Sequence, residues 1–136
     1  MSTRTFSNDY KYGTENELKQ LDTIRTVLRD KKIKRSEKQF SSYDYKSKSK
    51  RIELKSRFNA SYKYPTTMLS VSKVEDAESY DGEYYYFFHF TDKLMYIQYD
   101  KDQFDEYERK IMSRCDRGRV ESNNYVLIPI NDLSTV

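Results

Sequence analysis

The spacing of apolar residues predicts an amphipathic helix near the start of the chain. Thr14 and Glu17 have the spacing of a capping box, with residue 14 as the N-cap. Leu21, Ile24 and Leu28 then follow at intervals of three and four residues, so they share one helical face. We therefore expect the first helix to begin at residue 14 and to pack through this stripe.

Alternating and continuous apolar runs predict strands along the rest of the chain. Two strands, at about 40–45 and 51–58, flank a short polar run and are expected to form a hairpin. The aromatic run at 83–91 is continuous, which is typical of a central strand covered on both faces. Two further strands are expected at 94–99 and 125–130.

The remaining segments favour two more helices. Pro65 suits the first turn of a helix, because its missing N–H is not needed there, but the composition of 67–74 also allows a strand. Residues 102–111 have the pattern of a short helix, and 114–124 that of a basic loop. The resulting order, α-β-β-α-β-β-α-β, predicts an α/β fold with a central mixed sheet flanked by helices.

Length and composition predict one domain. We place it at residues 13–136, after a flexible polar arm at 1–12. Leu, Ile, Val and Phe make up only 28 of the 136 residues, and 14 Tyr rings supply the missing apolar volume. One Cys excludes an internal disulfide, and no apolar run is long enough for a membrane span or a signal peptide. We expect an intracellular protein, cytoplasmic or nuclear, that is neither secreted nor bound to a membrane.

Charge is unevenly distributed, although the net charge is only +3. Residues 29–58 carry 12 basic and 4 acidic side chains, whereas 75–108 carry 2 basic and 11 acidic ones. A basic segment supplies affinity for a polyanion such as the DNA backbone, which makes nucleic acid the expected partner. One His and three Gly exclude a histidine cluster and disfavour a Gly-rich phosphate loop.

Two carboxylates fall within the basic segment. If the chain turns at 48–49, Tyr45 faces Ile52 and Asp44 faces Glu53 across the hairpin. Opposed like charges destabilise a strand pair. A divalent cation between them relieves the repulsion, since Mg²⁺ prefers one or two carboxylates together with water and phosphate oxygens. We therefore expect a Mg²⁺ or Mn²⁺ site here.

Neighbouring groups extend this candidate site. The backbone carbonyl of Leu54 is a further oxygen ligand of the kind that hard cations accept. Glu17 continues the apolar stripe of the first helix, so its carboxylate either points toward the sheet as a third acidic ligand or closes the capping box. Strand alternation places Lys55 on the face of Glu53, where it either neutralises the acids or orients an attacking water on a phosphate.

Basic and aromatic side chains surround the site. Those expected to contact nucleic-acid phosphates are Lys46, Lys48, Lys50, Arg51, Arg57 and Lys73. For Lys73, an ordinary solvated lysine is the favoured alternative. Tyr43, Tyr45, Tyr62 and Tyr64 either pack in the fold, which we favour, or stack on unpaired bases.

This arrangement resembles the PD-(D/E)xK phosphodiesterase superfamily, which includes type II restriction endonucleases, archaeal Holliday junction resolvases and small phage nucleases. The matching residues are Glu17 on a first helix, Asp44 on one strand, and Glu53-Leu54-Lys55 on the next. The resemblance covers residues 14 to about 90, and Ser42-Tyr43 stands where the family name has Pro. It implies a restriction endonuclease-like core and a metal-dependent nuclease with Glu17, Asp44, Glu53 and Lys55 in its catalytic site.

The expected function is therefore a Mg²⁺-dependent endonuclease acting on DNA, including branched or repair substrates. Cutting both strands of a duplex would suit a twofold homodimer, since one small domain holds one site. Two alternatives stay open. The first is a nucleic-acid-binding module that does not cleave. The second is a protein-interaction adaptor whose acidic segment, 75–108, docks a basic partner.

Overall fold

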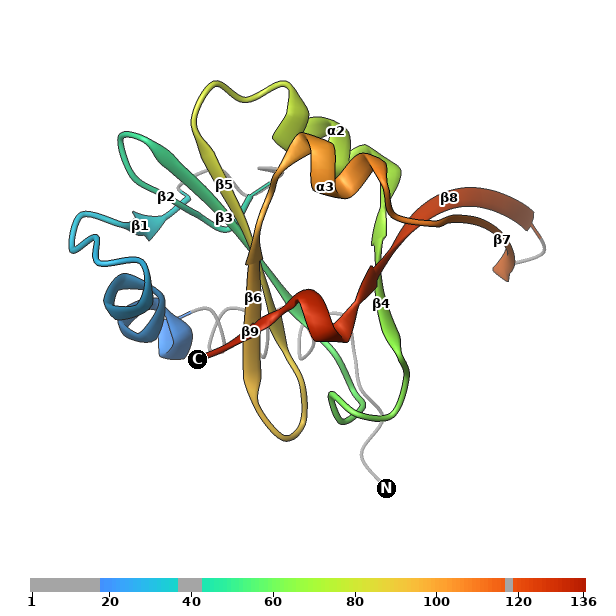
Figure 1. The fold of residues 1–136 in the computed structure, drawn as a ribbon, viewed down its shortest axis with the longest axis horizontal. Coiled ribbons are helices and arrows are strands. Elements are labelled where there is room, and N and C mark those ends of the chain that lie inside the picture. The colour runs from blue at the N-terminus through green and yellow to red at the C-terminus, as the bar shows by residue number, and fades with distance from the viewer. Residues whose placement is uncertain (1–17, 37–42, 117–118) are drawn as a thin grey trace.

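Two β-sheets organise the chain, which the computed structural model describes over residues 18–36, 43–116 and 119–136 (Figure 1). The larger sheet has six strands in the order β1 (Lys34–Arg35), β2 (Tyr45–Lys46), β3 (Lys50–Ser56), β5 (Glu83–His89), β6 (Leu94–Gln98) and β9 (Ser134–Thr135). The smaller sheet has three strands in the order β4 (Thr66–Ser70), β8 (Arg119–Pro129) and β7 (Arg109–Asp116).

Short helices connect and cover these sheets. Residues 18–27 form an N-terminal helix, followed later in the chain by α2 (Val71–Glu78), α3 (Lys101–Asp105) and the 3₁₀ turn η1 (Ile130–Asp132). Helices α2 and α3 lie at one end of the space between the two sheets, and η1 at the other (Figure 1). None of the helices in the described ranges is long and apolar enough to cross a membrane.

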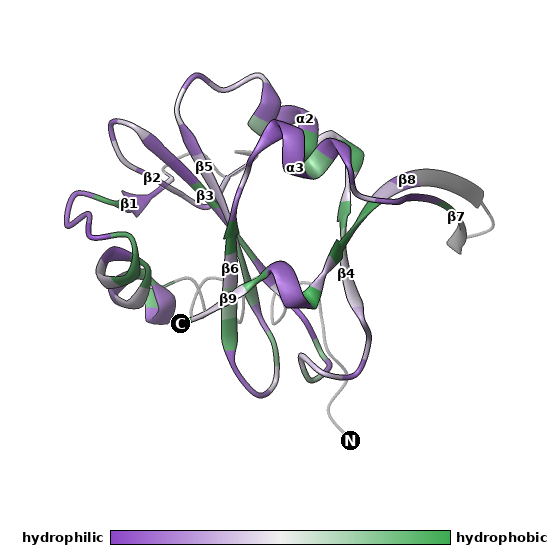
Figure 2. Ribbon diagram, viewed as in Figure 1, coloured by the Kyte–Doolittle hydropathy of each residue, from purple (hydrophilic) through white to green (hydrophobic). Residues whose placement is uncertain are grey.

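Each face of the six-stranded sheet has its own apolar core. The N-terminal helix covers one face, where Ile24 packs with Ile52 and Phe87. On the other face, side chains of β5 and β6 pack against α2, α3 and the three-stranded sheet, with Phe104 of α3 fully inside. Figure 2 shows hydrophobic residues gathered along the strands in the middle of the molecule. Tyr86 belongs to this second core, so tyrosine does replace aliphatic volume as predicted.

The central position of the aromatic strand is confirmed. β5 pairs with β3 in parallel and with β6 in antiparallel orientation, which makes the sheet mixed. Five consecutive residues of β5, Tyr84 to Phe88, are buried because both faces of the strand are covered. The parallel pairing needs a crossover, and β4 with α2 provides it.

Several expected boundaries were wrong. The helix expected at 102–111 ends at Asp105. The chain that follows forms β7, which pairs with β8 over eight residue pairs. The basic loop expected at 114–124 is therefore part of the β7–β8 hairpin, which extends away from the body of the molecule (Figure 1). The region after Pro65 contains both of the alternatives considered, first strand β4 and then helix α2.

Some expectations lie outside the described residues. These are the N-terminal arm at 1–12, the capping box of Thr14 and Glu17, and residues 40–42 of the strand expected at 40–45. Within the described part, β1 is an additional short strand that the sequence pattern did not indicate.

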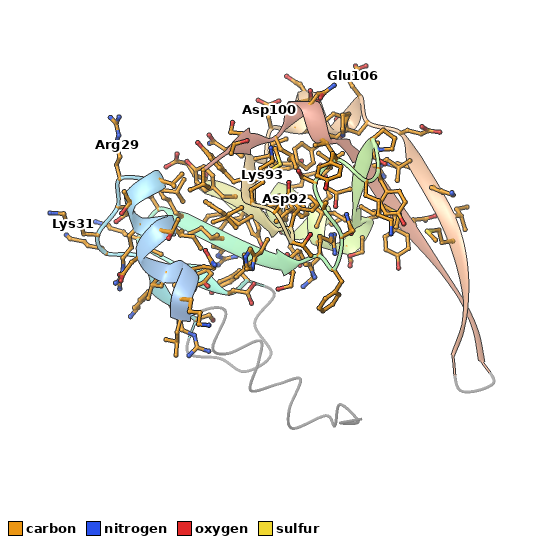
Figure 3. The ribbon with its side chains drawn as sticks, turned by 90° about the horizontal axis from the view of Figure 1, so that it is seen from below. Arg29, Lys31, Asp92, Lys93, Asp100 and Glu106 are labelled. Carbon is orange, nitrogen blue, oxygen red and sulfur yellow. The ribbon has the colours of Figure 1, made fainter. Side chains whose placement is uncertain are left out.

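The N-terminal helix is joined to the sheet by a group of charges. The helix is followed by a turn at 28–29, where Arg29 has a φ of 54°. Figure 3 shows Arg29 and Lys31 directed away from the sheet. Between them, Asp30 points inward and its Oδ2 lies 3.3 Å from Lys50 Nζ, which is also 3.4 Å from Glu83 Oε2. Lys50 therefore links this turn to β3 and β5.

The aromatic strand provides a stability test. Replacing Phe87 by Ala leaves a cavity in a fully buried site, so we expect the free energy of unfolding to fall by about 3–5 kcal/mol. Phe58 is 74% exposed, so Phe58→Ala is the matched control, with an expected change within about 0.5 kcal/mol. Urea unfolding followed by circular dichroism measures both. Equal losses in the two variants would contradict the assigned core.

Candidate active site

Asp44 is held against β3 by an irregular pairing of the predicted hairpin. Tyr45 faces Ile52, as predicted. The Asp44 N–H also donates to the Ile52 carbonyl, at 2.9 Å, so two residues of one strand lie against one residue of the other. This arrangement has the form of a β-bulge, a feature that redirects side chains and is common beside active sites. Asp44 therefore does not lie directly opposite Glu53, and the expected direct pairing of the two residues is wrong.

The redirected carboxylate is fixed beside Glu53. Asp44 Oδ2 accepts a hydrogen bond of 2.7 Å from the backbone N–H of Leu54, the residue next to Glu53. Burial raises the pKa of Glu53, and the charge of Asp44 adds a smaller upward contribution. Asp44 is thus tied to the residue that follows Glu53. That the two acids share one cation stays a prediction.

Glu53 is a buried acid with one satisfied oxygen. Its side chain lies on the sheet face that α2 covers, and the residue is only 4% exposed. Oε1 lies 3.3 Å from Lys55 Nζ and 3.2 Å from Lys73 Nζ. Oε2 is buried and has no hydrogen-bond partner among the described residues. A buried oxygen without a partner is costly, so this atom marks a place for a further cation or donor.

Burial governs the protonation of Glu53. Removal from water raises its pKa above the ordinary value, because the charged form loses its solvation. The ammonium groups of Lys55 and Lys73 oppose this shift, and Asp44 adds to it. The net direction is upward, so the two lysines do not fully compensate for the buried charge. A divalent cation bound to Oε2 would favour the ionised form.

Lys73 pairs with Glu53 and is only partly exposed, so its interpretation as a solvated lysine was wrong. It lies on α2, twenty residues after Glu53 in the chain. The Tyr86 hydroxyl donates to the Lys73 carbonyl at 2.7 Å, and Tyr86 is the neighbour of Glu53 in the parallel register. The central strand thereby fixes the helix turn that carries Lys73. A helix pattern alone could not reveal this contact, because it depends on the crossover.

Arg51 of β3 and Arg57, the residue after β3, are both engaged by the protein. The Arg51 guanidinium lies between two rings, 4.6 Å from the Tyr43 centroid and 4.0 Å from the Tyr80 centroid. Arg57 donates to Thr67 Oγ1 at 3.1 Å and to the Met68 carbonyl. Arg57 therefore ties the end of β3 to β4.

The lysines of the hairpin have different environments. Lys48 is exposed at the turn, whereas Lys50 forms ion pairs with Asp30 and Glu83. Lys46 pairs across the sheet with Lys34 on one side and Arg51 on the other. These three residues, Lys34, Lys46 and Arg51, form a cationic row on the same face as Glu53. Like charges directly opposite each other in a sheet are unfavourable, so this row has a cost in stability.

The residues present fit a hard divalent cation. Asp44 and Glu53 offer carboxylate oxygens. The Leu54 carbonyl points to the same side of β3 as the Leu54 N–H, which donates to Asp44. Such an all-oxygen set suits Mg²⁺ or Mn²⁺ better than zinc. Glu17, the expected third acid, lies outside the described residues. Within the described ranges, no three or more His, Cys, Asp or Glu side chains form a metal-binding group.

Comparison with known proteins gives one match. A family model described as "Phage putative PDDEXK endonuclease" matches residues 9–136. The match extends beyond residue 90, where the sequence motif ends, and includes the β7–β8 hairpin. No curated protein and no solved structure matches the chain.

The raised pKa of Glu53 predicts a pH-dependent stability. Because the folded state binds this proton more tightly than the unfolded state, protonated Glu53 contributes its full stabilisation below the ordinary pKa of 4.5. That contribution is lost as the pH rises through the higher pKa that Glu53 has in the folded protein. In the absence of metal, Glu53→Gln should therefore raise the melting temperature at neutral pH and leave it nearly unchanged at acidic pH.

The matched control is Glu75→Gln, at an exposed position on α2. It should not alter the pH profile of the melting temperature. If Glu53→Gln instead lowered the melting temperature at neutral pH more than at acidic pH, the ion pairs with the lysines would outweigh burial.

Proposed function

Because the chain belongs to the family of phage PDDEXK endonucleases, we propose that it is a metal-dependent endonuclease that hydrolyses phosphodiester bonds in DNA. The observation that carries the proposal is the buried Oε2 atom of Glu53, which lacks a hydrogen-bond partner in the described residues and lies in the field of Asp44. A structural ion pair with two lysines would not by itself explain why a second carboxylate is fixed beside it. A cation shared by both acids would.

We assign the metal ligands to Asp44, Glu53 and the Leu54 carbonyl, with Glu17 as the further acidic ligand. Mg²⁺ or Mn²⁺ at this position would lower the pKa of a bound water and stabilise charge on the phosphate oxygens. The backbone hydrogen bond to Asp44 orients one carboxylate before any ligand arrives. Such preorganisation reduces the reorganisation needed during the reaction.

The two lysines have complementary roles in this proposal. Lys55 and Lys73 approach the same oxygen of Glu53 from a strand and from a helix, and each is partly exposed. Their ammonium groups can therefore donate to Glu53 and also reach a phosphate at the surface. Lys55 is assigned to orienting the attacking water, and Lys73 to holding the scissile phosphate.

The cationic row continues from this site across β3, β2 and β1. We assign Lys34 and Lys46 of this row, together with Lys48 at the exposed turn, to the flanking phosphates of the substrate. Arg51, which lies between the Tyr43 and Tyr80 rings, is assigned to supporting the site. Lys50 and Arg57 are assigned to supporting the fold around the site, since their partners are side chains and backbone of the protein itself.

A cleavage assay tests the catalytic assignment. With Mg²⁺ or Mn²⁺ and plasmid DNA, Asp44→Asn, Glu53→Gln and Lys55→Ala should each lower the cleavage rate by about 100-fold or more, a typical cost of losing charge stabilisation in the transition state. Glu75→Gln is the control and should cleave at the wild-type rate. Calorimetric titration with Mn²⁺ should show binding to the wild type and none to Asp44→Asn with Glu53→Gln. Cleavage that persists in this double variant would refute the site.

The salt dependence of DNA binding tests the cationic row. Without metal, Lys34→Gln and Lys46→Gln should each reduce the slope of log K against log salt by about 0.9 for duplex DNA, because each removes one phosphate contact. Lys19→Gln, on the N-terminal helix across the sheet, should leave the slope unchanged. A slope that responds equally to all three substitutions would show that only net charge matters.

A further inference from the structure

An exposed aromatic surface lies beside the candidate active site. The segment 57–65, between β3 and β4, carries Tyr62 at 84% exposure and Tyr64 at 54%. Packing, the favoured interpretation of the tyrosines, holds for Tyr45, which is fully buried, and is wrong for these two. Large rings left in water at one place indicate a binding surface.

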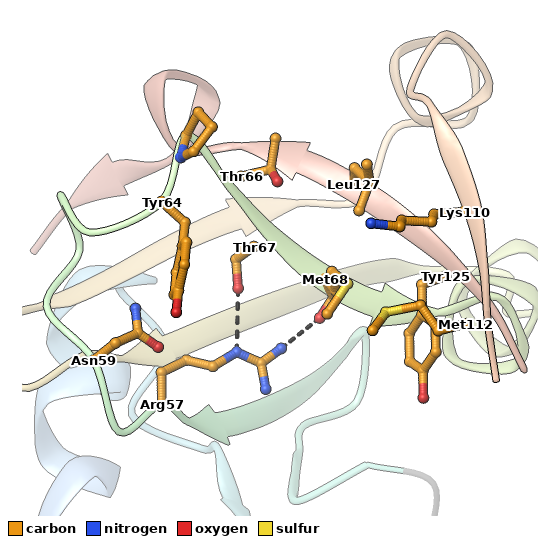
Figure 4. Close-up of a pocket in the computed structure, with 11 residues that line it drawn as sticks. Arg57, Asn59, Tyr64, Thr66, Thr67, Met68, Lys110, Met112, Tyr125 and Leu127 are labelled. Carbon is orange, nitrogen blue, oxygen red and sulfur yellow. Dashed lines mark hydrogen bonds between the residues drawn. The ribbon is translucent and has the colours of Figure 1, made fainter. Parts of the chain in front are cut away.

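Tyr64 lines a pocket, and Tyr62 lies two residues before Tyr64 in the same segment. The pocket has a volume of about 540 Å³ and lies between the end of β3, strand β4 and the base of the β7–β8 hairpin. Figure 4 shows Arg57 on one side and Lys110 and Met112 of the hairpin on another, with Tyr64 beside Arg57. None of the lining residues is acidic, and most of the exposed lining is apolar.

The aromatic segment is held in place before any ligand binds. Ser61 is buried, and its N–H and hydroxyl donate to the two carboxylate oxygens of Asp92 at 2.8 and 2.6 Å. The Thr91 N–H donates to the Asn59 carbonyl at 3.1 Å, which adds a second tie to the turn between β5 and β6. Figure 3 labels Asp92 in that turn. Tyr62 and Tyr64 therefore project from an anchored segment.

The pocket lies at the end of the strand that carries Glu53 and Lys55, and Arg57 lines it. Arg57 follows Lys55 by two residues, so it lies about 6.6 Å further along the same face of the chain. Its guanidinium contacts Thr67 and the Met68 carbonyl, both of which line the pocket. A strand whose phosphate reaches Lys55 would thus lead directly toward the aromatic surface.

We propose that this pocket, with Tyr62 and Tyr64, binds unpaired nucleobases next to the scissile phosphate, so that the substrate is DNA with a single-stranded segment. The inference rests on the proposed nuclease function and specifies its substrate class. Aromatic rings stack on the faces of bases, which are accessible only where the bases are unpaired, and cations among the rings attract the backbone. Lys63, 5.5 Å from the Tyr64 centroid, and Lys110 supply those charges.

The same chemistry disfavours a second copy of the chain as the occupant. A twofold contact through this surface would bring its lysines and arginine toward those of the other copy. The surface offers no carboxylate in the pocket to compensate. An anionic ligand with flat apolar rings matches both the charge and the shape.

Binding measured without metal tests the proposal separately from cleavage. Fluorescence anisotropy in EDTA compares a short duplex with the same duplex carrying a single-stranded thymine tail. The wild type should bind the tailed duplex more tightly. Tyr62→Ala and Tyr64→Ala should each reduce that preference by about 5- to 150-fold, the range for losing one base–aromatic stack, while affinity for the blunt duplex stays constant.

Two matched variants sharpen this comparison. Tyr64→Phe keeps the ring and should retain the preference for the tailed duplex. Loss of the preference in this variant would show that the hydroxyl, and not stacking of the ring, is responsible. Leu18→Ala removes a side chain that is 54% exposed on the N-terminal helix, across the sheet, and should have no effect.

Other outcomes overturn the proposal in distinguishable ways. Equal affinity for both DNAs, unchanged in the tyrosine variants, would refute the base-binding pocket but leave the nuclease assignment intact. A tailed-duplex preference untouched by the tyrosine variants, together with a dimer that dissociates in them by light scattering, would show an interface between copies instead. Failure of the wild type to bind any DNA would remove the proposed function as well.

Discussion

A buried carboxylate is the constraint on which this structure depends. Glu53 is almost fully covered, yet its two lysine neighbours satisfy only one of its oxygens. Burying an acid without complete compensation destabilises a fold, so the surrounding elements must supply the difference. The aromatic strand β5 does so on one side, since Tyr86 packs beside Glu53 and also holds α2 in place.

The hairpin and the crossover make separate contributions to the site. The hairpin supplies Asp44, Glu53 and Lys55 from one short stretch, and the bulge turns Asp44 toward the Leu54 N–H. The crossover supplies Lys73 and, through β4, the partners of Arg57. The charged face is therefore covered by elements that also create a neighbouring apolar pocket. The same crossover therefore shapes both the polar site and the neighbouring pocket.

The sequence predicted the parts of this arrangement that depend on local pattern. Strand alternation gave the shared face of Glu53 and Lys55, and the aromatic run gave the central strand. What it did not predict depends on pairing between distant segments. Residues 109–111, expected to be helical, and 114–116, expected to lie in a loop, become part of β7 by pairing with β8. Likewise, the exposure of Tyr62 and Tyr64 follows from where Asp92 holds Ser61, and hydropathy carries no sign of that contact.

The parallel pairing of β3 with β5 also determines the order in which the site can assemble. Asp44 and Glu53 are nine residues apart, so their hairpin can form early and locally, whereas Lys73 arrives only after the chain has closed the longer crossover. Until then Glu53 faces water and ionises like any free side chain. Desolvation of the acid is thus a late event in folding, and the barrier to that last docking step should be sensitive to pH even where the hairpin is not.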